Sequence, residues 1–135
     1  MKDARPELSF MPRFLYSHVP MATVKKVVHV MRRFVPDKWG GTESVVLHLA
    51  REGARQGVES IIFCTDMFSR PGPDRYQNVL IWRFRYLFPW FGLSGAAKEQ
   101  LRLKGGSPLS LGLFFRLLRE KDVSLIHTHV QHRLG

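Results

Sequence analysis

Three groups of residues in this sequence are of types that can do chemistry. They are a glycine pair, an arginine pair and a histidine cluster: Gly40 and Gly41; Arg32 and Arg33; His127, His129 and His132. Glycines let a ligand approach the backbone closely, and a helix N-terminus offers unpaired N–H groups with a partial positive charge. Arginine binds phosphate or carboxylate groups, and histidine binds metals or transfers protons. Which of these chemistries is possible depends on how the fold places the three groups.

The glycine and arginine pairs each admit two interpretations. Gly40 and Gly41 match neither the G-x-G-x-x-G loop of dinucleotide-binding proteins nor a P-loop. They form either a turn that faces a phosphate or a tight strand-to-helix connection without a ligand. Arg32 and Arg33 either hold an anionic group of an acceptor or form a solvated basic turn.

The histidine cluster admits a metal site, a ligand contact or a purely structural role. A spacing of two places His127 and His129 on the same face of a strand, as a metal site would require. No carboxylate or thiol near them in the sequence completes a ligand set, so we expect no metal. The histidines then cap the strand or contact a ligand beyond its carboxyl end, where open α/β sheets bind ligands. His29, inside an earlier strand, is expected to be a core residue.

Hydrophobic patterning predicts the elements that position these residues. Four short apolar runs indicate buried strands: residues 24–31, 60–65, 79–84 and 125–129. Between the first two strands, Thr42–Gln56 is predicted to be a helix that ends at Gly57. Its sheet-facing side is expected to contain Val45, Val46, Leu49 and Ala50. A second helix is predicted to begin after Ser107 as its N-cap and to end at Arg119, and a short one to span residues 96–104.

The order of these elements indicates an α/β domain with a mostly parallel sheet. Residues 1–22 contain three prolines and no sustained period, so they are expected to be a flexible leader, with Met21 as a candidate start. The domain then occupies residues 23–135. A last strand without a following helix suggests that the sheet is incomplete.

Charge and cysteine content limit the class of protein. The 135 residues carry a net charge of +10, which favours anionic partners such as phosphorylated substrates, nucleic acid or an acidic membrane. One cysteine, Cys64, excludes a disulfide framework and a cysteine-rich zinc site, and is compatible with a cytoplasmic protein. No apolar run approaches the ~20 residues that a membrane-spanning helix needs.

An aromatic and basic segment spans residues 82–104. Six of its first ten residues are aromatic, and its five basic residues against one acidic residue give a net charge of +4. Interfacial aromatic rings flanked by cations suit an anionic membrane surface. The alternative is that half of the rings face the core. Nucleic acid is the least favoured partner of this segment.

Two segments resemble the family-4 glycosyltransferases. Val28–Glu43 joins a strand and a proline-containing loop to Gly-Gly-x-Glu, and an amphipathic helix ending at Gly57 follows. Asp122–His129 is similar to the "D-V-I-H-x-H" strand of these enzymes. Residues 66–106 match nothing in particular in the family.

The resemblance implies a GT-B architecture, in which the active site lies between two Rossmann-like domains with helices on both faces of each sheet. Residues 23–135 would be the truncated N-terminal, acceptor-side domain, and the C-terminal donor-binding domain with its Glu-x7-Glu motif would be absent. The implied reaction transfers a sugar from a nucleotide-sugar donor to a glycan or lipid-linked acceptor with retention and without a metal cofactor. Polysaccharide biosynthesis in the cytoplasm, or at the inner face of the membrane, is the implied setting.

The resemblance also assigns roles to individual residues. The N–H groups of Gly40 and Gly41 would face the donor diphosphate and sugar, and His129 would contact the donor sugar as the catalytic residue. For Arg32 and Arg33 the acceptor role rests on their position at the end of the first strand and not on the resemblance. We expect this chain alone to be inactive. The alternative function is a non-catalytic basic module that docks on membranes or polyanions.

Overall fold

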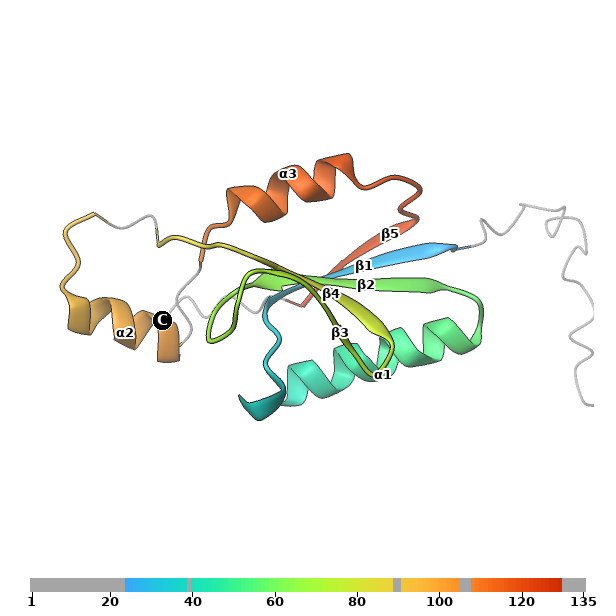
Figure 1. The fold of residues 1–135 in the computed structure, drawn as a ribbon, viewed down its shortest axis with the longest axis horizontal. Helices are drawn as coiled ribbons and strands as arrows, with labels where there is room; N and C mark the ends of the chain where they lie inside the picture. Colours follow the sequence, from blue (N-terminus) through green and yellow to red (C-terminus); the bar gives the residue numbers. More distant parts are fainter. Residues whose placement is uncertain (1–23, 39, 89–90, 105–107, 130–135) are drawn as a thin grey trace, which may run out of the picture.

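The computed structural model, drawn in Figure 1, describes residues 24–38, 40–88, 91–104 and 108–129. A five-stranded sheet with the order β3-β4-β2-β1-β5 lies at its centre. The strands are β1 (Lys26–Arg33), β2 (Glu59–Thr65), β3 (Gly72–Tyr76), β4 (Val79–Phe84) and β5 (Leu125–Thr128). Only β3 is antiparallel to its neighbour in this described part of the chain. The predicted α/β fold with a mostly parallel sheet is confirmed, and the expected leader, residues 1–22, lies outside the described residues.

Helices cover both faces of the sheet, as expected for a Rossmann-like domain. In Figure 1, α1 (Gly41–Arg55) lies on one face and α3 (Leu111–Arg119) on the other. The short helix α2 (Gly95–Lys104) lies beyond the carboxyl ends of the strands. A short 3-10 helix, η1 (Pro36–Lys38), follows β1. None of the helices in the described part of the chain has the length and apolar character that crossing a bilayer requires.

The buried face of α1 differs from the predicted one. It contains Glu43, Val46, Leu47 and Ala50, which follow the i, i+3, i+4, i+7 pattern. Val45 and Leu49 are 55% and 40% exposed, so the prediction that they face the sheet is wrong. The predicted end of the helix is confirmed, because Gly57 adopts a left-handed conformation with φ of 78°. The actual phase of α1 turns a charged residue, Glu43, inward.

The strand β3 was not predicted. A turn at Gln77 and Asn78, both with positive φ, joins it to β4 in an antiparallel hairpin. The strand is polar because it lies at the edge of the sheet, where its middle residues are exposed. Its Asp74 pairs at 2.6 Å with the buried Arg83 of β4, which also donates to the carbonyl of Phe34.

The start of α3 also differs from the prediction. Ser110, not Ser107, is the N-cap: its hydroxyl accepts a hydrogen bond from the N–H of Leu113 and donates one to the carbonyl of Arg85. The cap therefore also ties α3 to the chain that follows β4. Ser107 itself lies outside the described residues.

A matched pair of substitutions tests the phase of α1. Val46→Ala removes methyl groups from a fully buried site and should lower the free energy of unfolding by about 2 kcal/mol. Val45→Ala makes the same chemical change at an exposed site and should change it by less than about 0.5 kcal/mol. Urea unfolding measures both values, and a larger effect at Val45 would mean that the helix is rotated.

The pH dependence of stability tests the Asp74–Arg83 pair. The hydrogen bond from Arg83 lowers the pKa of Asp74 below its ordinary value. Stability from this pair is therefore present above the ordinary pKa of aspartate and is lost as the pH falls through the lowered pKa. Because Asp74 is half exposed, Asp74→Asn should cost only about 1 kcal/mol at pH 7. Urea unfolding should show this difference shrinking toward about pH 3; a constant difference would contradict the pair's role.

Candidate functional site

A cavity of about 310 Å³ lies where β1 ends and α1 begins. Its lining residues are Met31, Arg32, Arg33, Gly40, Gly41, Thr42, Glu43 and His129. The structure thus brings together the glycine pair, the arginine pair and one histidine that sequence reasoning had singled out. They meet because β1 and β5 are adjacent parallel strands, whose carboxyl ends lie at the same edge of the sheet. His132 lies outside the described residues.

The N-terminus of α1 forms one wall of this cavity. Gly40 is an extended N-cap with φ of −131°, and within the described chain no side chain caps the helix. The first N–H groups of α1 therefore remain available to a ligand in the cavity. A Cβ at Gly40 would come within 2.8 Å of Glu43 Oε2, whereas a Cβ at Gly41 would meet nothing within 4 Å. Only Gly40 is required by local packing.

Glu43 is a site residue that sequence reasoning missed as one. Its carboxylate is buried, with Oε1 3.7 Å from Nε of Arg33. An acidic group in the first turn of a helix is favoured by the helix dipole. The correct helical phase would have predicted that Glu43 is buried, because Glu43 shares a helix face with Val46, Leu47 and Ala50. The Glu43 carboxylate therefore largely balances the positive charge of Arg33 within the site.

Arg32 is anchored to α2. Its Nη2 donates to the carbonyl oxygens of Leu101 and Arg102, both at 2.9 Å, in the last turn of that helix. A cation at this position is favoured by the helix dipole. Burial, and secondarily the charge of Arg33, lower the pKa of Arg32. Its buried Nε has no hydrogen-bond partner among the described residues.

Three histidines gather beside the cavity, and one of them, His129, lines it. His29 of β1 lies directly opposite His127 of β5 in the sheet register, and the backbone N–H of His129 donates to the carbonyl of Val30 at 2.7 Å. Nδ1 of His29 and Nε2 of His129 are 3.1 Å apart and share a hydrogen bond. His29 is buried, as predicted, but it contacts two imidazoles and is not merely part of the apolar core.

Two of these imidazoles, those of His29 and His129, have pKa values below the ordinary value and are neutral at pH 7. Burial lowers the pKa of His29 to about 4, assisted by His129 and His127. Burial also lowers the pKa of His129, assisted by His127. At neutral pH the rings of His29 and His129 therefore each keep one nitrogen with a lone pair and one with a proton. The hydrogen bond between His29 and His129 fixes the orientation of the His129 ring beside the cavity.

Comparison with known proteins finds a partial similarity to a mannosyltransferase. Over 63 residues, or 47% of the chain, the sequence is 30% identical to the O-antigen chain mannosyltransferase C of Escherichia coli. The chain spans 17% of the length of that protein. No family model matches the sequence, and no solved structure gives a significant match. The chain is thus similar, over about half its length, to part of a glycosyltransferase.

Proposed function

We propose that the chain is the N-terminal, acceptor-side domain of a retaining family-4 glycosyltransferase with a GT-B architecture. Its donor is a nucleotide-sugar, and its acceptor is a glycan or a lipid-linked glycan. The observation that carries the proposal is the meeting of the α1 N-terminus and His129 on one cavity at the carboxyl ends of parallel strands. The similarity to a mannosyltransferase supports it and makes a mannosyl group the first sugar to test.

The α1 N-terminus supplies stabilisation for the leaving diphosphate. Sugar transfer breaks the bond between the anomeric carbon and a diphosphate oxygen, so negative charge develops on the diphosphate. The N–H groups beyond Gly40 and Gly41 point partial positive charge at that position without any rearrangement. The cavity is at the small end of the range for ligand sites, which suits a sugar and diphosphate but not a whole nucleotide.

His129 and the arginines act on the two substrates. The neutral His129 ring, oriented by His29, contacts a hydroxyl of the donor sugar. Arg32 and Arg33 line the same cavity, and a charge-assisted hydrogen bond from either would hold an anionic group of the acceptor. In this mechanism the helix N-terminus carries the charge stabilisation of the diphosphate, and we assign no metal cofactor to that role.

A matched glycine pair tests donor binding. Gly41 and Gly95 each begin a helix, and a Cβ at either meets nothing within 4 Å, so both alanine variants should fold. Gly41→Ala places a methyl group at the proposed diphosphate site and should weaken binding of GDP-mannose by about tenfold or more, or about 1.4 kcal/mol. Gly95→Ala should leave binding unchanged. The measurement is amide chemical-shift titration of the chain, and equal binding by both variants would contradict the proposal.

The role of His129 is tested in the full-length enzyme that contains this domain. His129→Ala should lower kcat/KM by at least about tenfold while the protein stays folded. His48→Ala, at an exposed position on α1, is the control and should leave kcat/KM unchanged. An unchanged kcat/KM in a folded His129→Ala enzyme would reduce His129 to a structural residue.

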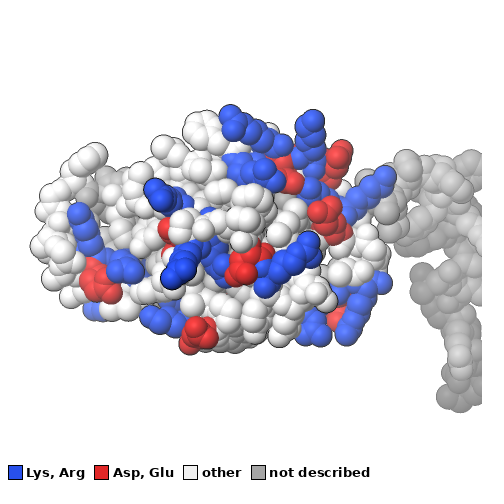
Figure 2. Space-filling model, in the orientation of Figure 1, with Lys and Arg blue, Asp and Glu red and all other residues white. Residues whose placement is uncertain are grey.

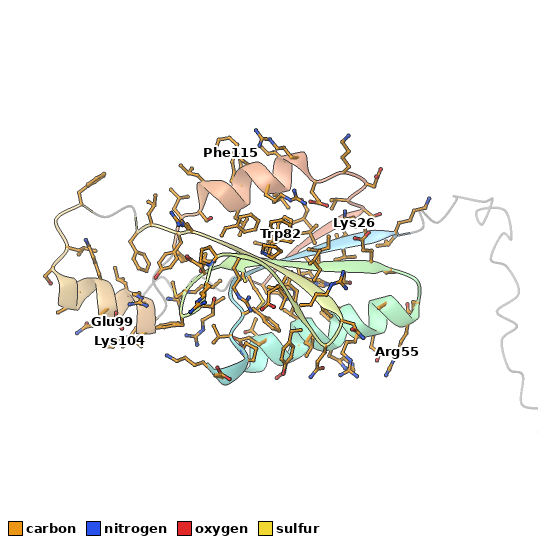
Figure 3. The ribbon with its side chains drawn as sticks, viewed as in Figure 1. Lys26, Arg55, Trp82, Glu99, Lys104 and Phe115 are labelled. Atoms are coloured by element: carbon orange, nitrogen blue, oxygen red, sulfur yellow. The ribbon has the colours of Figure 1, made fainter. Side chains whose placement is uncertain are left out.

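One observation favours a second function, docking on an anionic membrane. The outward face of α3 exposes Leu111, Phe114, Phe115 and Leu118, each by more than half. Basic side chains stand beside this face in Figure 2, and Figure 3 shows Phe115 pointing away from the sheet. Trp82 and Phe84 of the aromatic segment pack beneath α3, with the Arg116 guanidinium 4.8 Å from the Trp82 ring centre. Trp82 and Phe84 therefore face the core, as the alternative for this segment expected, and the proposed membrane contact moves to the exposed face of α3.

Vesicle co-sedimentation tests this second function. Binding should rise with the anionic lipid content and fall with salt, because the attraction is screened. Replacing Phe114 and Phe115 with serine should reduce it several-fold. Val45→Ser, an exposed apolar change on the opposite face of the sheet, should not. Equal sedimentation of both variants would exclude α3 as the contact.

A further inference from the structure

The three imidazoles of the site lie within reach of a single ion. His29, His127 and His129 each offer a ligand nitrogen, and these nitrogens all lie within 4.8 Å of one another. Two of the residues are opposite one another on neighbouring strands, and the third follows the end of β5. The grouping is therefore a consequence of sheet register and does not depend on a loop conformation.

The distance between two of the imidazole nitrogens is close to the distance between two ligand nitrogens of a bound metal ion. Tetrahedral zinc binds imidazole nitrogen at about 2.0–2.1 Å, which places two ligand nitrogens about 3.3 Å apart. Nδ1 of His29 and Nε2 of His129 are already 3.1 Å apart. The ring of His127 is centred 4.0 Å from that of His129 and is exposed, so a small rotation can bring its nitrogen into place.

The chemistry of the donor set selects the class of ion. All three ligands are nitrogens, which suit zinc, copper, nickel or cobalt and not the oxygen-seeking magnesium or calcium. Histidine ligates these metals through a neutral imidazole nitrogen, and each of the three residues offers one. His129 also lines the cavity, from which water can complete a four-coordinate site.

We propose that His29, His127 and His129 form a binding site for a divalent transition-metal ion, with Zn²⁺ as the first candidate. The ion replaces the proton shared between His29 and His129 and joins β1 to β5 through side chains as well as backbone. The proposal rests on this cluster alone and does not depend on sugar transfer.

Calorimetric titration of the tag-free chain with zinc chloride tests the site. A background in which His18 and His132 are alanine leaves His48 as the single histidine outside the cluster. We expect one zinc ion per chain, no binding of magnesium, and a tetrahedral visible spectrum with Co²⁺. His127→Ala and His29→Gln should each weaken zinc binding by about tenfold or more, because each removes one of three ligands.

The control variant is His48→Ala, which should bind zinc as the parent does. Because His127 is exposed, its replacement should leave the fold intact, and circular dichroism checks this for every variant. Unchanged zinc binding in a folded His127→Ala chain would overturn the proposal. Loss of binding in His48→Ala, or the absence of any zinc binding by the parent, would overturn it as well.

Discussion

The site depends on one backbone pairing, that of β1 with β5. Parallel hydrogen bonds place His29 opposite His127, and the N–H of His129 continues the pairing to the carbonyl of Val30. A slip of one residue would move every side chain of β5 to the other face of the sheet. His127 and His129 would then no longer contact His29, and His129 would no longer line the cavity. Register therefore determines both the fold of the sheet edge and which side chains meet at the cavity.

Buried charges are tolerated because each sits at the end or edge of the sheet with a partner. Glu43 faces Arg33 near the end of β1, Arg83 faces Asp74 on the edge strand, and Lys26 is paired with Glu120 near the start of β1. Removing one member of a buried pair costs more than the pair contributes, because the remaining charge is left unpaired. The middle of the sheet, in contrast, is apolar on both faces, with Val28, Ile62, Phe63 and Ile81 almost fully buried.

The features of the fold that depend on a local hydrophobic pattern could be predicted from the sequence. Three of the four predicted strands stand out as β-branched or aromatic runs, and the gathering of Gly40, Arg33 and His129 at one edge follows from parallel pairing. The phase of α1 was missed because Val45 and Leu49 are apolar yet exposed. The edge strand β3 was missed because its stability comes from a turn and its neighbour, not from hydrophobicity. The partnership of His29 with His129 spans 100 residues, and no local signal reports it.

The positive groups that line the cavity differ in how free they are to bind an anion. Arg33 is balanced by Glu43, and Arg32 is held by two carbonyls of α2, so neither guanidinium is fully free to attract an anion. The first turn of α1, in contrast, has no capping side chain in the described structure, and its N–H groups can bind an anion without breaking an existing bond. In the proposed function, backbone N–H groups and not side chains would therefore stabilise an incoming diphosphate. A side chain at Gly41, where packing would tolerate one, would then stand between the helix and this ligand.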